Sequence, residues 1–186
     1  MRLRNIIILL TILLVLGGYY YYAYLIPKPA TPKEPQYYAW LIEMDDIQHI
    51  EISLPSENKS QSFIKISEPD KFPWYFDDPQ RSNVDTKRWG GGIPLLLSGP
   101  GVARYFSNAP QDKLVEYGLT QPQMEIDLIL TDNKTMNIII GDKTPDGNSH
   151  YVLAPNTNNN VGLVDYTWFD VLAKLVTNPP YATPSP

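Results

Sequence analysis

The sequence predicts an α+β protein in which a single N-terminal transmembrane helix precedes a domain of mainly antiparallel β-sheet with a few packed helices. Three observations carry this prediction. An unbroken apolar run occupies residues 6–26 and ends at Pro27. Further along, short segments alternate apolar and polar residues between polar turns, which is the period of a half-buried strand. Residues 165–176, near the end, have helical spacing instead.

The apolar run predicts a membrane anchor that is retained rather than cleaved. Its 21 residues give a helix of roughly 31 Å, which matches the hydrocarbon thickness of a bilayer. A signal peptidase needs small residues at its cleavage site, but bulky tyrosines stand there. Two arginines before the run favour a cytoplasmic N-terminus, and the tyrosines resemble an interfacial aromatic belt. The predicted membrane-interface residues are Arg2, Arg4, Tyr19, Tyr20, Tyr21, Tyr22 and Tyr24.

Proline predicts the boundaries of the parts, because many of the 18 prolines cluster near the two ends of the chain. Residues 1–26 are expected to form a cytoplasmic stub and signal anchor, followed by a stiff, extended linker at 27–36. Residues 37–178 form the extracytoplasmic α+β domain, and residues 179–186 form a proline-rich tail. We therefore expect a single-pass protein of the cell (plasma) membrane with its bulk on the extracytoplasmic, or periplasmic, side.

Charge and cysteine content exclude several classes of protein. Of the 15 basic residues, Arg2 and Arg4 precede the anchor, so residues 27–186 carry 13 basic and all 20 acidic residues, a net charge of −7. Nucleic acid is excluded as a partner, because phosphate binding needs a basic face. The chain has no cysteine, which excludes disulfides, thiolate metal sites and cysteine nucleophiles.

The first half of the domain contains three expected strands and an interrupted helix. Residues 47–54 alternate, although the spacing from Ile47 to Ile50 breaks the strict period. Residues 62–67 read as a second strand and residues 72–76 as a short aromatic one. Residues 86–101 read as a short helix or as two interrupted pieces, because the three glycines at 90–92 weaken a helix, and Pro94 suits a first-turn position.

The second half repeats this plan with clearer alternation. Residues 124–130 and 136–140 form a hairpin around a polar turn, and residues 150–154 and 160–164 form two further strands. The helix at 165–176 follows. Both halves run hairpin, strand and helix, and "NVDTKRW" resembles "LVDYTW" at the two helix entries. A duplication of one unit is one hypothesis; the alternative is that α+β proteins repeat such motifs without common ancestry.

A longer stretch carries a family resemblance. Residues 115–175, "VEYGLTQPQ…IIIGDKTPDGNSHYVL…DVLAKL", resemble the bacterial domain-of-unknown-function 4340 family, which typically shows a "YGL…P" turn and an "IGdkTpdG…yY" signature. Its members are usually envelope proteins behind one N-terminal helix, and some are encoded near transporters. The triple glycine departs from the family pattern, and the family has no established catalytic residues to carry over. The matching positions are Tyr117, Gly118, Leu119, Pro122, Gly141, Thr144, Gly147, Tyr151 and Val164.

None of the polar motifs predicts a catalytic, cofactor or metal site. Residues 141–153 place Asp142, Asp146 and Asn148 near one another, but strands flank them and no distal glutamate follows, so they indicate a turn rather than a calcium loop. "RWGGGIP" lacks the lysine and hydroxyl residue of a phosphate-binding loop. His49 and His150 are interpreted as surface histidines.

The aromatic residues Trp74, Tyr75 and Trp89 form the predicted interaction surface, with core packing as the alternative interpretation. The sequence thus predicts a non-catalytic accessory or scaffold subunit of an integral-membrane complex, without cofactors. Its expected partners are integral-membrane protein subunits and the lipid bilayer. The alternative is an envelope module that binds a glycan or small molecule, associated with a transporter.

Overall fold

The computed structural model describes residues 3–22, 37–69, 72–90 and 92–182, which fall into two compact units, residues 1–35 and 36–186. The first unit contains one long helix, α1 (Leu3–Tyr20), whose side chains are all exposed. Among the described residues, α1 is the helix that is long and apolar enough to cross a membrane.

The predicted interface residues fall on α1 and just beyond it. Arg4, Tyr19 and Tyr20 lie on the helix, and Tyr21 and Tyr22 form a π turn after it. Arg2, Tyr24 and the predicted linker at 27–36 lie outside the described residues. An apolar helix without buried side chains has no protein core to cover it, so it is compatible with a single-pass membrane segment.

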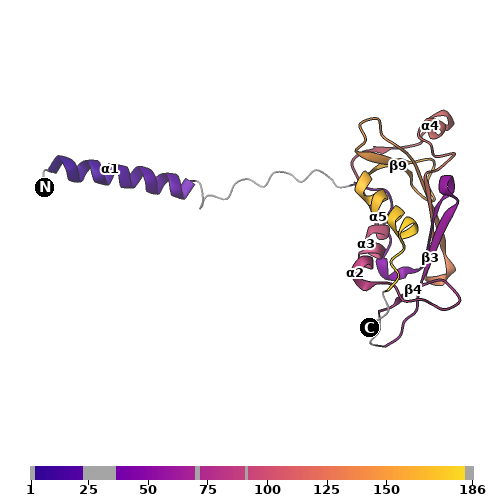
Figure 1. Ribbon diagram of the computed structural model, residues 1–186. Helices are drawn as coiled ribbons and strands as arrows, with labels where there is room; N and C mark the ends of the chain where they lie inside the picture. The colour runs from indigo at the N-terminus through magenta and orange to yellow at the C-terminus, as the bar shows by residue number, and fades with distance from the viewer. Residues whose placement is uncertain (1–2, 23–36, 70–71, 91, 183–186) are drawn as a thin grey trace. The chain divides into compact units, whose positions relative to one another are not determined.

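An eight-stranded antiparallel sheet forms the frame of the second unit (Figure 1). Its strand order is β4-β3-β2-β7-β8-β9-β10-β6. A separate two-stranded sheet pairs β1 (Tyr37–Tyr38) with β5 (Gly101–Val102). The strands of the large sheet are β2 (Ile47–Leu54), β3 (Lys59–Lys65), β4 (Trp74–Phe76), β6 (Tyr105–Phe106), β7 (Met124–Leu130), β8 (Thr135–Lys143), β9 (Ser149–Leu153) and β10 (Val161–Asp165).

Helices cover one face of this sheet. In Figure 1, α2 (Thr86–Trp89), α3 (Ile93–Ser98) and α5 (Tyr166–Thr177) lie together on one side of the strands. The alternation of the central strands matches this arrangement: Ile50 and Ile52 are fully buried, while Glu51 between them is exposed. The hydrophobic core therefore lies between the sheet and these three helices.

Another short helix, α4 (Gln111–Glu116), packs on the opposite face near β8, β9 and β10. Its Leu114 joins a second apolar cluster with Leu153 and Ile139, whereas their strand neighbours Val152 and Ile140 belong to the main core. Successive residues of a strand point to opposite faces, so the two clusters lie on the two sides of the sheet. Three short 3₁₀ turns complete the unit: η2 (Met44–Asp46), η3 (Pro55–Glu57) and η4 (Thr131–Asn133).

The predicted α+β class is confirmed, and several boundaries agree closely with the structure. Strand β7 covers residues 124–130, as predicted, and the glycine-interrupted region forms two separate helices, α2 and α3. Helix α2 ends at Gly90, which has a φ of 67°, a conformation that favours glycine. The sequence analysis did not anticipate α4, β1, β5 or β6.

The two halves of the domain meet at the β2–β7 pair. Outward from that pair the order is β2, β3, β4 on one side and β7, β8, β9 on the other. The helices that end the halves begin in the same way, because Asp85 accepts hydrogen bonds from backbone N–H groups of α2 and Asp165 accepts one from α5. This arrangement is compatible with the duplication hypothesis, which stays a prediction.

The described C-terminal residues belong to the folded unit. The Asp85 backbone N–H donates to the Pro180 carbonyl over 2.7 Å, and Val84 pairs with Tyr181 in an isolated β-bridge. The Tyr181 ring stacks on Phe76 with ring centroids 4.0 Å apart. Residues 179–182 of the predicted tail are thus attached to the start of α2.

Candidate interaction groove

An apolar groove opens where the segment 37–41 crosses α3 and the start of α5. It has a volume of about 510 Å³. Most of its wall is formed by leucine, aromatic, proline and glycine residues. The lining residues are Tyr38, Leu41, Leu95, Leu96, Ser98, Gly99, Pro100, Gly101, Val164, Asp165 and Trp168.

Two indole groups fix the geometry of this groove. The Trp40 N–H donates to the Leu97 carbonyl over 2.8 Å, and the Trp168 N–H donates to the Leu96 carbonyl over 2.9 Å. The two rings meet edge to face with centroids 6.1 Å apart, an arrangement that aromatic pairs prefer. Buried indole N–H groups need an acceptor, so the last turn of α3 is held to both neighbouring segments.

Backbone hydrogen bonds complete the attachment of the N-terminal segment. The Ala39 N–H donates to the Pro100 carbonyl over 3.1 Å, and the Ile42 N–H donates to the Ser98 carbonyl over 2.8 Å. These bonds leave the Leu41 side chain pointing away from the core, with 74% of its surface exposed. Leu95 on α3 is 62% exposed. Two large aliphatic side chains in water beside an apolar groove indicate a contact surface.

The polar groups of the groove already have partners. The Ser98 hydroxyl donates to the Leu95 carbonyl over 2.9 Å. Asp165 accepts hydrogen bonds from the hydroxyl and the backbone N–H of Thr167, and the hydroxyl bond is the main cause that holds the pKa of Asp165 below its usual value. The groove therefore offers mainly apolar contact.

The aromatic residues that the sequence analysis selected lie elsewhere, and two of them are buried. Trp74 is 5% and Trp89 1% exposed, and their rings pack 5.4 Å apart. Tyr75 is half-buried. The predicted interaction surface at Trp74, Tyr75 and Trp89 is thereby corrected: the two indoles belong to the core side of the sheet, and Tyr75 alone offers appreciable surface. Trp74 on β4 and Trp89 on α2 both belong to the main core between the sheet and the helices.

His49 has a carboxylate partner that sequence spacing did not reveal. Its Nε2 lies 2.9 Å from Asp77 Oδ2, and Arg81 forms an ion pair with the other Asp77 oxygen. Burial alone raises the pKa of Asp77, but hydrogen bonds and charge from Arg81 and His49 outweigh it and lower the pKa below its usual value. No hydroxyl of the described residues is hydrogen-bonded to His49, so the group fastens β2 to the segment after β4 and does not form a nucleophile–base pair.

The loop between β8 and β9 is a turn. Asp146 accepts hydrogen bonds from the Thr144 hydroxyl and from the backbone and side chain of Asn148, and the Thr144 bond is the main cause that lowers the pKa of Asp146. Gly147 has a φ of 75°. Among the described residues, no group of three or more acidic or histidine side chains is placed to hold a metal ion. The turn interpretation explains these contacts without a ligand.

His150, expected at the surface, is 6% exposed. Its Nδ1 lies 3.1 Å from the Gly141 carbonyl oxygen, and its ring stacks on Phe169 with centroids 4.1 Å apart. Burial is the main cause that lowers its pKa. His150 lies on the same face of β9 as the buried Val152, two residues further along, so the alternation of the strand directs it to the core.

Several of the positions that carry the family resemblance have structural roles in this domain. The Tyr117 ring stacks on Tyr151 at 4.1 Å, and the Asp142 N–H donates to the Tyr117 carbonyl over 2.8 Å. Gly118 has a φ of 69°, and Gly141 lies against the Tyr117 backbone. These residues join the end of α4 to the irregular part of β8, which gives them a structural reason independent of catalysis.

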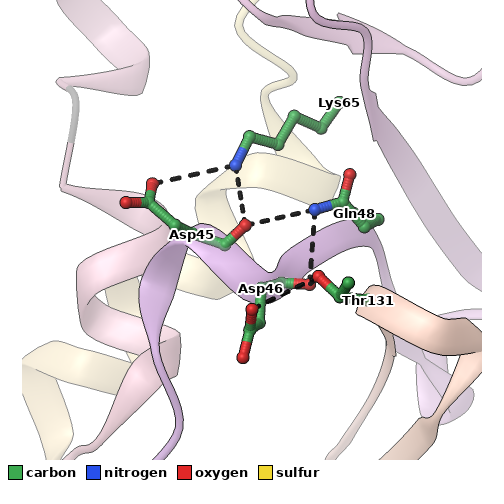
Figure 2. Close-up of polar contacts among 5 residues, drawn as sticks. All are labelled: Asp45, Asp46, Gln48, Lys65 and Thr131. Carbon is green, nitrogen blue, oxygen red and sulfur yellow. Dashed lines mark hydrogen bonds and ion pairs between the residues drawn. The ribbon is translucent and has the colours of Figure 1, made fainter.

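A polar cluster ties η2 to β2, β3 and η4 (Figure 2). The Lys65 ammonium donates to the Asp45 carbonyl over 2.9 Å, and the Asp45 carboxylate lies 3.8 Å from it. The Gln48 side chain donates to the same carbonyl over 3.1 Å. The Thr131 hydroxyl donates to the Asp46 carbonyl over 3.2 Å. Every bond here serves to fasten η2, but Lys65 also lines a pocket with Trp74 and Trp89.

Comparisons with known proteins add no family: no family model, curated protein or solved structure matches the chain. The resemblance to the domain-of-unknown-function 4340 family therefore stays a prediction from the residues quoted above.

Proposed function

We propose that this chain is a non-catalytic, membrane-anchored accessory subunit of a larger integral-membrane assembly, with its interaction domain on the extracytoplasmic side. The observation that supports the proposal best is the apolar groove with its two exposed leucines, Leu41 on the segment that follows the anchor in the chain and Leu95 on α3. The apolar helix α1 supplies the attachment to the bilayer.

The length of chain between the two units limits which partners the groove reaches. Fourteen residues separate Tyr22 from Tyr37, and a chain of that length spans at most about 50 Å. Tyr38 and Leu41 on the groove wall come directly after this stretch. A partner of the groove must then be held in, or close to, the same membrane.

The occupant that we assign to the groove is an apolar extracytoplasmic segment of an integral-membrane protein. An anionic lipid surface is disfavoured by the net charge of −7 over residues 27–186, since like charges repel at close range. Apolar side chains, in contrast, gain free energy by covering Leu41 and Leu95, at about 25 cal/mol per Å² of buried surface.

Photo-crosslinking in intact cells tests this assignment. A photoreactive residue replaces Leu41 or Leu95 in the full chain, and the matched control replaces Val115, which is 59% exposed on α4. We expect adducts at the two groove positions with one protein that has transmembrane segments of its own, and none with it at Val115. The Leu95→Glu variant should reduce co-purification of that protein after gentle solubilisation by about tenfold or more, because a charge then faces its apolar segment.

Three outcomes contradict the proposal. Adducts with lipid alone would assign the groove to the bilayer, and adducts between two copies of the chain would assign it to self-association. Equal capture of the same protein at Val115 would show contact without use of the groove.

A further inference from the structure

A second, smaller pocket of about 170 Å³ lies at the end of the sheet where β3, β4, η2 and the short helices meet. It is independent of the groove and shares no residue with it. Its walls are aromatic, proline and methionine side chains with one cation and one carboxylate. The lining residues are Met44, Asp45, Lys65, Phe72, Pro73, Trp74, Trp89 and Pro94.

One of the residues that line this pocket, Trp89, carries a buried hydrogen-bond donor without a partner. Within the described residues, Trp89 Nε1 is the buried side-chain nitrogen or oxygen that makes no hydrogen bond. The fold supplies acceptors for the corresponding atoms of Trp40 and Trp168. Leaving a buried donor unpaired costs free energy. An acceptor atom of a bound ligand would remove this cost at Trp89.

The Lys65 ammonium supplies positive charge to the same pocket. Its side chain is 17% exposed, so it is largely withdrawn from water. Among the described residues it donates to the Asp45 carbonyl. The Asp45 carboxylate is 3.8 Å away and its side chain is 88% exposed (Figure 2). An ammonium group has three donors, so Lys65 has capacity for an anionic oxygen.

We infer that this pocket binds a small compound whose carboxylate is attached to a six-membered ring. The carboxylate contacts Lys65, and a movement of the pocket wall would let it also accept from the Trp89 N–H, which is buried in the empty pocket. The flat face of the ring packs on Trp74, as apolar or C–H-rich rings do on indole. Such a ring belongs either to an aromatic acid or to an acidic sugar, and the two share the chemistry that the pocket recognises.

Titration of the full chain in detergent micelles tests this inference. Sodium benzoate and sodium glucuronate are the probes, benzamide and glucose are their neutral counterparts, and sodium chloride keeps the ionic strength equal. We expect saturable thermal stabilisation and a change of tryptophan fluorescence with at least one acid, and neither with its neutral counterpart. The acid that binds identifies the source of the ring.

The variants separate recognition from folding. Lys65→Met keeps the aliphatic stem and should weaken binding by about tenfold or more, since a charged hydrogen bond is lost. Lys59→Met, on the same strand but paired with the exposed Glu57, should leave binding unchanged. Trp89→Phe removes the N–H donor and keeps an aromatic ring, and it should weaken binding by a smaller factor. The inference is overturned if neither acid saturates, if acid and neutral compound act alike, or if Lys59→Met weakens binding as much as Lys65→Met.

Discussion

Gly141 allows two segments of the backbone to approach more closely than any side chain permits. A Cβ atom built there would lie 2.1 Å from the Tyr117 carbonyl oxygen and 3.1 Å from the Leu119 nitrogen. Both contacts are with backbone, which cannot rotate away as a flexible side chain can. The approach also places the Asp142 N–H on the Tyr117 carbonyl.

Replacing Gly141 with alanine is therefore expected to lower the free energy of unfolding by about 2–3 kcal/mol, from overpacking and the loss of that hydrogen bond. Gly147→Ala is the matched control. Its Cβ would meet nothing within 4 Å, so only the cost of a positive φ, about 1 kcal/mol, applies. Urea unfolding of both variants measures the difference, and equal losses would contradict the close-approach argument.

His150 should make the domain less stable in mild acid. Burial lowers its pKa below the usual 6.5, and the nearby Lys143 adds to this, while the hydrogen bond to the Gly141 carbonyl opposes it in part. With a depressed pKa, the unfolded chain binds the proton first. Stability is therefore lost as the pH falls from about 6.5 towards the pKa of the folded state.

The measurement is the free energy of unfolding between about pH 7.5 and pH 5. His150→Gln should remove part of the slope. The carboxylates with lowered pKa values, such as Asp146 and Asp165, act in a different window. Their contribution is lost only as the pH falls below their ordinary pKa of 3.8. An unchanged slope in His150→Gln would refute the role of His150.

At the scale of elements, the segment after α5 functions as a clasp on α2. The Arg88 guanidinium donates to the Asn178 and Pro179 carbonyls, and the backbone of Asp85 and Ala182 adds two further bonds. Helix α2 has only 4 residues, too few to be stable alone. The clasp and the Asp85 cap hold it in place.

Ending the chain after Asn178 is expected to cost about 2–3 kcal/mol, from the lost hydrogen bonds and the lost stacking of Tyr181 on Phe76. Ending it after Ala182 removes only residues 183–186 and should change nothing measurable. Thermal unfolding of the two truncated chains decides the question. A clasp without energetic importance would give both chains the same midpoint.

The helices and strands also differ in how well the sequence predicts them. Strand β7 was predictable because apolar residues alternate over its 7 positions, long enough for the period to be seen, and β2 because they alternate from Ile50 to Leu54. Strands β1, β5 and β6 have 2 residues each, and two residues define no period. Helix α4 begins after Pro110 without a capping side chain, so no start signal marks it.

The candidate site escaped prediction for a related reason. The groove brings together the segment 37–41, α3 and the start of α5, which lie far apart in the sequence. Its strongest signal, the exposure of Leu41 and Leu95, exists only after folding. An apolar residue that is exposed looks the same in a sequence as one that is buried, so aromatic residues at Trp74 and Trp89 were selected although the core contains them.

For the whole molecule, the proposed function requires one orientation of α1 in the membrane. The helix has 18 residues, which gives about 27 Å, and the tyrosines at its end extend it to the headgroup region of a bilayer. The proposed orientation, with the N-terminus in the cytoplasm and the sheet domain outside, rests on the positive-inside rule applied to Arg2 and Arg4. Only that orientation lets the groove meet extracytoplasmic partners.

Single cysteines test this orientation cleanly, because the natural chain has none and gives no background labelling. We expect Val115→Cys to react with a membrane-impermeant maleimide in intact cells, since Val115 is 59% exposed on the sheet domain. Asn5→Cys, at the start of α1, should react only after the membrane is permeabilised. The full chain should also remain with the membranes in alkaline carbonate, because α1 is long and apolar enough to cross a bilayer. Labelling of Asn5→Cys in intact cells, or release by carbonate, would remove the basis for an extracytoplasmic interaction domain.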